Sequence, residues 1–254
     1  MTVRALPEDQ KQLLQLQAYD NRAAQLANSR RTLPQLAELS ARSAEADALR
    51  RRAIEARGVL EDARAELKRV ESDVAVVDAR IVRDTTRLQS VTNAKDAQGL
   101  EHELASLAGR KSDLEDIELA VMERVEAAEA EFASIEAEQA SLAQIVATLE
   151  TGRDEAFSAI DTESAALTEK RLDLVALLPA DLVELYERQR ARYGIGAALL
   201  RRGVSEGSNV ALTGSDLAAI RAAAPDEVVL DPESGCILVR TDESGLDPKP
   251  RQDD

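Results

Sequence analysis

An apolar heptad repeat that begins at Leu39 is the feature that most constrains the fold. From there to Val91, alanine and aliphatic residues return at two positions of each heptad, with charged residues between them. The first position, a, is occupied by Leu39, Ala46, Ala53, Leu60, Leu67, Val74, Ile81 and Leu88. The second position, d, includes Leu49, Ala56, Ala63, Val70, Val77 and Val91, with exceptions at Arg42 and Asp84. Sustained spacing of this kind is typical of a coiled-coil seam.

A second apolar pattern follows a short interruption. Residues 89–96 contain serine, threonine, asparagine and aspartate, which compete with helical hydrogen bonding. Beyond them, apolar residues recur mainly in steps of three, four and seven from Leu100 to Leu174. Two long helices that are joined by a turn of a few residues run antiparallel. We therefore predict a helical hairpin whose two long helices and tip lie at 34–90, 97–177 and 91–96, respectively.

The two predicted helices differ in length, so the longer one needs a further partner. At 1.5 Å per residue the outgoing helix is about 85 Å long and the returning helix about 120 Å. An amphipathic segment at 8–28 can cover the excess. Pro34 separates this segment from the outgoing helix, because proline is accepted in the first turn of a helix but not in its interior. Residues 1–178 are therefore predicted to form one coiled-coil stalk.

Composition agrees with long helices and limits the possible functions. Hydrophobic residues make up 44% of the chain but aromatic residues only 2%, which leaves few large rings for a globular core. Cys236 is the only cysteine, so a four-thiolate metal site is excluded. The formal net charge of -16 argues against a large phosphate-binding face. The polar start and the absence of a window of roughly 20 apolar residues favour a cytoplasmic protein without membrane contact.

The sequence changes character after Pro179. Residues 179–246 contain short helical segments and two β-rich runs, and Asp-Pro-Glu-Ser-Gly joins these runs as in a hairpin. The polar, proline-containing end at 247–254 is predicted to be disordered. The expected fold class is therefore mostly α, a long antiparallel coiled-coil hairpin with a small β-rich C-terminal head.

Five segments give the chain a resemblance to a known family. They read LLQLQAYDNRAAQLANSRRTLPQL at 13–36, NAKDAQGLEHEL at 93–104, LYERQR at 185–190, IRAAAPDEVV at 220–229 and GCILVRT at 235–241. With them the chain resembles the bacterial C4-type zinc-ribbon coiled-coil family, especially its actinobacterial branch. The resemblance implies an elongated helical hairpin with a zinc ribbon at one end. The four cysteine positions of the family fall on Ser205, Ser208, Asp231 and Ser234.

The loss of all four cysteines changes what the resemblance implies about metal. Serine hydroxyls are poor zinc ligands and one carboxylate cannot hold the ion alone, so we expect a degenerate zinc-ribbon-like head without zinc or another cofactor. A structural zinc contributes about 10–16 kcal/mol in small ribbons. We expect backbone N–H groups that bind Asp231 and Ser234 to replace part of this stabilisation. A small apolar core is expected from Leu199, Leu200, Leu217, Ile220, Val228, Val229, Ile237, Leu238 and Val239.

No residue pattern indicates catalysis. His102 is the only histidine, and we interpret it as a residue of the helix surface. Acidic pairs on the predicted helices are interpreted as solvated faces. The glycines of GIGAALLRRG, at 194–203, lack the Lys-Ser/Thr pair of a phosphate-binding loop. We therefore expect no enzyme activity.

Two functional hypotheses follow. In the first, the chain is an adaptor or scaffold that binds proteins through its head and its tip, where the candidates are Asn93, Lys95, Asp96, Leu100 and Glu103. In the alternative, it binds nucleic acid through the head and a basic cluster formed by Arg188, Arg190, Arg192, Arg201 and Arg202. We favour the interpretation that these arginines pair with acidic groups of the chain. The sequence leaves open which protein is the partner and whether the alanine-rich part of the stalk forms a homodimer.

Overall fold

The computed structural model of the protein describes residues 3–246 and is mostly helical, as predicted. The predicted disordered tail, 247–254, lies outside the described residues. In chain order the elements are α1 (Pro7–Arg31), α2 (Pro34–Ser90), α3 (Ala94–Leu177), α4 (Ala180–Tyr193), β1 (Ala197–Arg201), β2 (Val204–Ser205), α5 (Gly214–Ala222), β3 (Val229–Leu230), β4 (Ile237–Val239) and the 3-10 helix η1 (Asp242–Ser244).

The bounds of the long helices lie close to the predicted ones. α2 matches 34–90, whereas α3 begins three residues earlier than predicted, at Ala94. This early start has a local cause, because the side-chain oxygen of Asn93 accepts a hydrogen bond from the backbone N–H of Lys95 at 3.0 Å. An acceptor of this kind satisfies one of the free N–H groups in the first turn of a helix.

The chain divides into two compact units, one formed by residues 34–152 and the other by residues 1–33 together with 153–254. This division differs from the predicted boundary between a stalk at 1–178 and a head at 179–246. The reason is that α1 and α4 share a hydrophobic core with the sheet, in which Leu13, Leu182 and Ile237 are fully buried. α1 and α4 therefore belong to the same unit as the C-terminal sheet.

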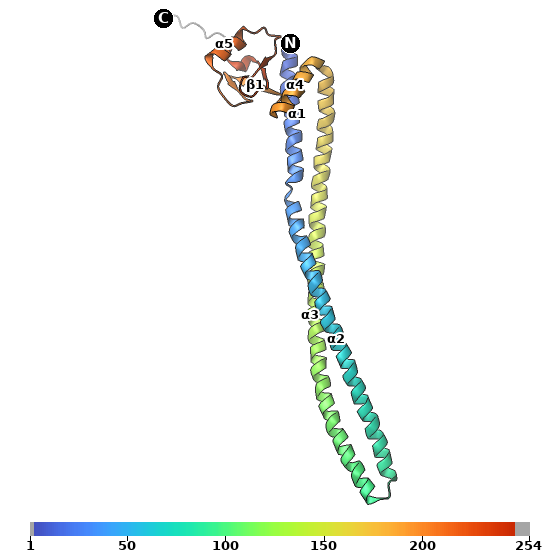
Figure 1. The fold of residues 1–254 in the computed structure, drawn as a ribbon. Coiled ribbons are helices and arrows are strands. Elements are labelled where there is room, and N and C mark those ends of the chain that lie inside the picture. The colour runs from blue at the N-terminus through green and yellow to red at the C-terminus, as the bar shows by residue number, and fades with distance from the viewer. Residues whose placement is uncertain (1–2, 247–254) are drawn as a thin grey trace. The chain divides into compact units, whose positions relative to one another are not determined.

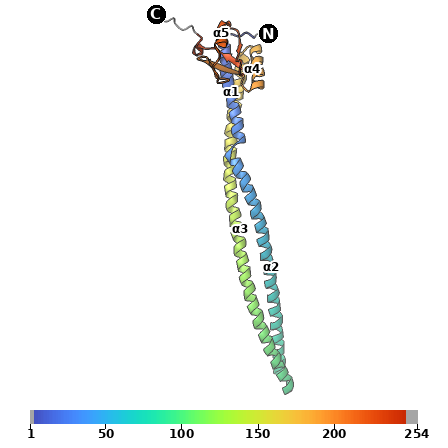
Figure 2. The ribbon, with the colours of Figure 1, turned by 60° about the vertical axis from the view of Figure 1, so that its left-hand side comes forward.

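The unit formed by residues 34–152 is an antiparallel pair of helices, α2 and the first part of α3, which lie side by side in both views (Figures 1 and 2). Its central core consists of Leu60, Ala63, Val125 and Ala128, with Phe132 packed against them. Alanine at such positions lets two helices approach closely. The predicted coiled-coil hairpin is thus confirmed.

The predicted d positions of α2 form the buried side of this pair. Leu49, Ala63, Val70 and Val77 are buried, and so is Asp84, at 6% relative exposure. Asp84 continues the seven-residue spacing, so the helix geometry carries its carboxylate into the seam. Its nearest charged partners are Arg80 and Arg87, each 3.7 Å away. The seam of residues 34–152 therefore contains one buried charged group at a position where the pattern calls for an apolar side chain.

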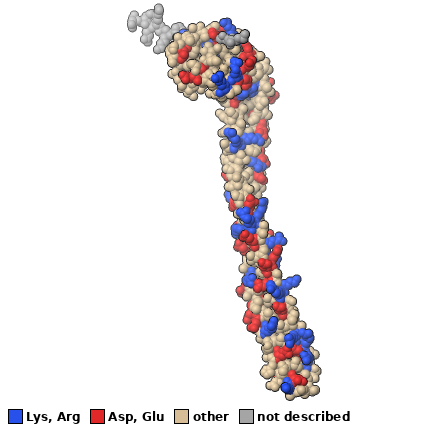
Figure 3. Space-filling view, viewed as in Figure 1, with Lys and Arg blue, Asp and Glu red and all other residues tan. Residues whose placement is uncertain are grey.

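Charged side chains of both signs are interspersed on the visible face of the long helices (Figure 3). Several join α2 to α3 across the edges of the seam, including Arg64 with Glu129 at 2.6 Å and Arg124 with Glu66 at 2.9 Å. These pairs are exposed, so each contributes little to stability. Burial of the apolar seam therefore provides most of the stabilisation of this unit.

The second unit is built around a small mixed sheet with the strand order β2-β1-β4-β3. β3 and β4 pair antiparallel, as the Asp-Pro-Glu-Ser-Gly turn predicted, and β1 pairs parallel to β4 with Ala197 opposite Ile237. Parallel pairing requires a long connection between the strands. That connection contains β2 and α5. The Thr213 hydroxyl caps the N-terminus of α5 by accepting a hydrogen bond from the backbone N–H of Asp216.

Apolar side chains pack on both faces of this sheet. On one face, Leu16 of α1 and Tyr186 of α4 join Ile237 and Val239 of β4 in the core. On the other, Leu200 and Leu238 pack with Leu212 and with Ile220 of α5. Eight of the nine core residues predicted for the head, all except Leu199, lie in these two clusters or pack against them. They are Leu200, Leu217, Ile220, Val228, Val229, Ile237, Leu238 and Val239.

Candidate functional sites

The tip of the hairpin is the turn between α2 and α3, residues 91–93, with the first turn of α3. Asn93, Lys95 and Asp96 are exposed, and the amide of Asn93 donates to the carboxylate of Asp96 at 3.2 Å. The turn is therefore held by its own side chains. Within residues 3–246 the ammonium group of Lys95 makes no hydrogen bond or ion pair. This leaves Lys95 with Asp96 as the exposed charges of the tip.

The prediction that the tip presents Leu100 is wrong. Leu100 is buried, at 8% relative exposure, because it is the first apolar residue of the α3 seam. Glu103 is half-buried and forms an ion pair with Arg80 of α2. The candidate surface at the tip is consequently smaller than predicted and consists of Asn93, Lys95 and Asp96.

In the C-terminal region the structure brings together the four predicted ligand positions. Ser205 follows the tight turn between β1 and β2, and Asp231 follows β3. The hydroxyl groups of Ser205 and Ser234 both donate to Oδ2 of Asp231, at 2.6 and 2.5 Å, and the N–H of Glu233 donates to Oδ1 at 3.1 Å. The backbone N–H of Gly207 in turn donates to Ser205 Oγ at 3.1 Å. We call Ser205, Ser208, Asp231 and Ser234 the Asp231 cluster.

Two members of the Asp231 cluster, Ser205 and Asp231, are buried, whereas Ser208 and Ser234 are half-buried. Asp231 is 1% exposed, and Cys236 is fully buried with its sulfur 3.1 Å from Ser234 Oγ. Burial opposes ionisation of Asp231, but the hydrogen bonds from Ser205, Ser234 and the Glu233 N–H outweigh it, so its pKa lies below the usual value. Burial raises the pKa of the Cys236 thiol, which therefore stays protonated. The cluster thus holds one fixed negative charge.

The side chains of the cluster do not fit a structural zinc. Two of the three hydroxyl groups donate to Asp231, and with the Glu233 N–H the cluster's one carboxylate already accepts three hydrogen bonds. Structural zinc needs four ligands, drawn mainly from thiolates and imidazoles. Among residues 3–246 no group of three or more histidine, cysteine, aspartate or glutamate side chains is placed to hold a metal ion. The absence of bound zinc in the protein stays a prediction.

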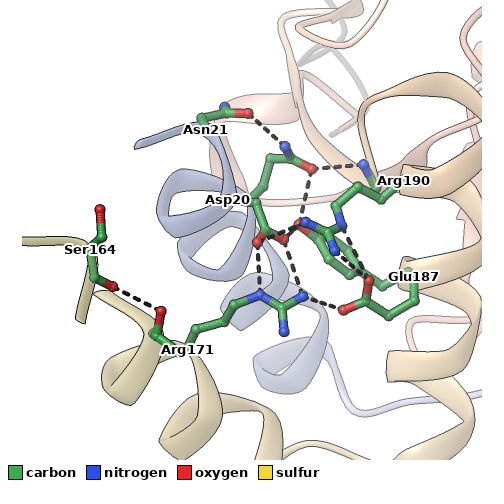
Figure 4. Close-up of polar contacts among 10 residues, drawn as sticks. Asp20, Asn21, Ser164, Arg171, Glu187 and Arg190 are labelled. Atoms are coloured by element: carbon green, nitrogen blue, oxygen red, sulfur yellow. Dashed lines mark hydrogen bonds and ion pairs between the residues drawn. The ribbon is translucent and has the colours of Figure 1, made fainter. Parts of the chain in front are cut away.

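A buried polar network lies where α1, α3 and α4 meet, and sequence reasoning did not find it (Figure 4). Asp20 of α1 is at its centre. Its carboxylate accepts hydrogen bonds from Arg171 Nε at 2.7 Å and from the Tyr186 hydroxyl at 2.7 Å, and Arg190 Nη1 lies 3.0 Å away. Glu187 binds both arginines, so two carboxylates face two guanidinium groups. A buried charge is tolerated when it is paired and hydrogen-bonded in this way.

The same network holds the start of β1. Gln17 of α1 uses its side-chain oxygen to accept hydrogen bonds from the backbone N–H groups of Gly196 and Ala197, at 2.7 and 3.2 Å. Glycine is required at 196, because a Cβ there would lie 2.4 Å from the ring of Tyr186. Desolvation and the hydrogen bond to Asp20 raise the pKa of Tyr186 well above its usual value. The network is therefore a structural anchor that joins α1 to α4 and to the start of β1.

The CT398-like coiled coil hairpin domain matches residues 16–194, from the middle of α1 to the end of α4. The chain belongs to this family. The matched range contains both long helices and the Asp20 network, whereas the sheet and the Asp231 cluster lie beyond it. The coiled-coil part of the expected resemblance is thereby confirmed, and the zinc-ribbon origin of the head stays a prediction.

Relatives of this CT398-like protein extend over nearly the whole chain. An uncharacterized Mycobacterium tuberculosis protein, Rv2229c, is 36% identical over 232 residues, which are 91% of this chain and 95% of the relative. A structure from Mycobacterium smegmatis is similar with a TM-score of 0.81 and 31% identity, and covers 94% of this chain and 100% of the other. CT398 from Chlamydia trachomatis, at 19% identity and a TM-score of 0.60, covers 91% of this chain and 97% of its own and shares the fold.

The five arginines that were predicted as nucleic acid candidates differ in whether they form ion pairs within the chain. Arg190 belongs to the Asp20 network, and Arg201 pairs with Glu206 at 3.2 Å and Glu243 at 3.0 Å. The guanidinium of Arg192 lies 5.1 Å from the ring centre of Tyr193. Within residues 3–246, Arg188 and Arg202 are exposed and form no ion pair. The expected pairing with acidic groups therefore holds for Arg190 and Arg201.

Among the helices of residues 3–246, none combines the length and the apolar character that a membrane span requires.

Proposed function

We propose that this protein is a non-enzymatic cytoplasmic adaptor that binds other proteins through the tip of its helical hairpin and through its metal-free C-terminal region. Membership of a coiled-coil hairpin family supports a structural role. Support for the C-terminal part comes from the Asp231 cluster, whose hydrogen bonds join Ser205 of β2 to the turn that follows β3. We infer that the exterior of this region serves as the second binding surface.

The observation that carries the proposal is the geometry of the tip. Asn93 closes the turn by binding the Lys95 N–H and the Asp96 carboxylate, so the backbone is fixed before a partner binds. A fixed loop loses less conformational entropy on binding than a mobile one. The exposed ammonium group of Lys95 then has no competing partner within the described chain. A preorganised turn with a free cation favours recognition of an acidic or hydrogen-bond-accepting protein surface.

A site-specific photo-crosslinker tests the role of the tip. We expect a photoreactive residue in place of Lys95 to yield a discrete crosslinked protein species in cells. Asp96→Ala should reduce this yield because it removes one of the side chains that fix the turn. A photoreactive residue at Gln144, an exposed position in the middle of α3, is the matched control. Equal crosslinking at both positions would argue against specific binding at the tip.

Nucleic acid binding is the second candidate function, supported by Arg188, Arg192 and Arg202. Each of them is exposed and lacks an ion pair within residues 3–246. Binding to phosphates should weaken steeply between about 50 and 200 mM salt. Arg188→Glu with Arg202→Glu should then abolish binding to single-stranded RNA or to duplex DNA, whereas Lys95→Ala with Asp96→Ala should leave it unchanged. Salt-insensitive or absent binding in a filter assay would exclude this function.

A further inference from the structure

An exposed apolar pair on α3 is surrounded by carboxylates. Leu119 is 61% exposed and Met122 is 42% exposed, and they are three residues apart on one helix, so their side chains are neighbours. Residues three or four positions away from Leu119 include Glu115, Asp116 and Glu123. We call this surface the Leu119–Met122 face. Large exposed apolar side chains that form a group, unlike single ones, mark interaction sites.

Further acidic residues lie next to Met122. Its helical neighbours include Glu118 and Glu126, so the apolar pair has five carboxylates around it. Four of these, all except Glu115, form no ion pair with a basic residue of the described chain. Glu115 lies 3.7 Å from Lys111, and Lys111 is itself held by Asp78 at 2.7 Å. The negative charge of this face is therefore not neutralised within the chain.

The charge of this part of α3 differs from that of α2. From Ser112 to Gly152, α3 contains 11 acidic residues and one basic residue, Arg124. Arg124 is directed away from the face, because it pairs with Glu66 of α2 at 2.9 Å. α2, by contrast, contains equal numbers of acidic and basic residues, 11 of each. The excess of negative charge therefore belongs to α3, the helix that carries Leu119 and Met122.

This combination points to one class of occupant. We propose that the Leu119–Met122 face binds a basic amphipathic helix of another protein, which inserts apolar side chains between Leu119 and Met122 and places lysine or arginine residues against Asp116, Glu123 and Glu126. Helical ligands of this type bind through apolar anchors at helical spacing. The flexible thioether of Met122 adapts to different anchors. Anionic lipids and nucleic acid are repelled by the same carboxylates.

A second copy of the chain is a poorer occupant. The chain has a formal net charge of -16, and two such faces would place ten carboxylates opposite one another. Like charges that face each other across an interface cost several kcal/mol. The proposal concerns a surface that is separate from the tip and from the Asp231 cluster, so it stands or falls independently of the function proposed above.

A synthetic amphipathic peptide of leucine and lysine heptads, with a fluorescent label, is the probe that tests the proposal. We expect the full-length protein to bind it in a fluorescence anisotropy titration at about 150 mM salt, where charge interactions beyond about 8 Å are screened. Leu119→Ser with Met122→Ser should weaken this binding about tenfold, the equivalent of about 1.4 kcal/mol. The control is Val76→Ser with Val82→Ser, which changes two valines of α2, 64% and 66% exposed, that lack a surrounding ring of carboxylates.

A charge variant separates local recognition from general attraction. Glu123→Lys with Glu126→Lys should weaken binding more than Glu136→Lys with Glu150→Lys, which removes the same charge elsewhere on α3. An equal loss in both pairs, an effect of the valine control as large as that of Leu119→Ser with Met122→Ser, or no binding would overturn the proposal. It would also be overturned if sedimentation revealed self-association that the Leu119 and Met122 substitutions abolish, because the occupant would then be a second copy. Circular dichroism of each variant verifies that the helices remain intact.

Discussion

At Asp231, a single buried carboxylate binds the hydroxyl groups of Ser205 and Ser234. It receives two hydroxyl donors and one backbone donor, and it is 1% exposed. Hydrogen bonds to a charged acceptor are roughly twice as strong as those between neutral groups. The stability of the surrounding strands should therefore depend on the ionisation of this one side chain.

We expect Asp231→Asn to destabilise the C-terminal strands by about 1–3 kcal/mol at neutral pH, because the amide cannot accept all of the existing donors. The pKa of Asp231 is lowered in the folded state, so its contribution is complete above the unfolded pKa of about 3.9 and is lost as pH falls through the lower folded value. Hydrogen exchange of the β3 and β4 amides should therefore differ between wild type and variant at neutral pH and converge in strong acid. Glu233→Gln, at an exposed side chain beside the cluster, is the control.

Tyr186 allows a similar experiment in the Asp20 network. Tyr186→Phe keeps the ring that packs against Gly196 but removes the hydroxyl donor to Asp20. The buried carboxylate retains Arg171 and Arg190, so we expect a loss of about 1–2 kcal/mol rather than unfolding. Urea denaturation followed by circular dichroism measures the effect. Tyr193→Phe, at an exposed ring, should change the midpoint little, and an equal effect of both substitutions would contradict the assigned role of the hydroxyl.

Among the helices, α2 contains a charge at a position where its repeat calls for an apolar residue. Asp84 occupies the seam at the spacing of Val70 and Val77, and its Oδ2 atom is buried without a hydrogen bond inside residues 3–246. Replacement of a buried charge by an apolar residue of similar volume is often neutral or stabilising. The end of the hairpin near the tip is thus less stable than its apolar pattern alone would make it.

Asp84→Val should raise the free energy of unfolding of the hairpin by about 1–3 kcal/mol, because it removes an incompletely paired charge and adds apolar contact. Hydrogen exchange near the tip, in residues 80–105, reports this change locally. The reverse substitution one heptad earlier, Val77→Asp, should destabilise the same region. If Asp84→Val instead increased exchange, the ion pairs of Asp84 with Arg80 and Arg87 would be stronger than their distances of 3.7 Å indicate.

In the molecule as a whole, the division into two units assigns α1 and the C-terminal part of α3 to the same unit as the sheet. Leu182 is fully buried in the core of this unit. Val125 belongs to the core of the other. Because the two cores share no residue, local unfolding should begin in each of them separately.

We therefore expect Leu182→Ala, with a cost of about 2–5 kcal/mol, to increase hydrogen exchange in α1, α4 and β1 while the amides of residues 55–135 retain their protection. Val125→Ala should have the converse effect. The two variants form a matched pair, since each creates a cavity in one core only. Uniform loss of protection in either variant would mean that the continuous helix α3 couples the units into a single cooperative one.

The sequence by itself determined the long helices, the position of the turn and the β3–β4 hairpin, because these depend on apolar spacing and turn residues within short segments. The apolar pattern of α3 begins at Leu100, so the sequence also indicated that Leu100 is buried, although we counted it among the candidates at the tip. Only the tertiary structure decided which residues share a core. The parallel pairing of β1 with β4, the hydrogen bond from the Val228 N–H to the Val3 carbonyl and the contact of Gln17 with Gly196 join residues up to 225 positions apart. No local pattern specifies such contacts. The same holds for Asp20. Its polar side chain is typical of a helix surface, and only the tertiary structure places Arg171, Tyr186 and Arg190 around it.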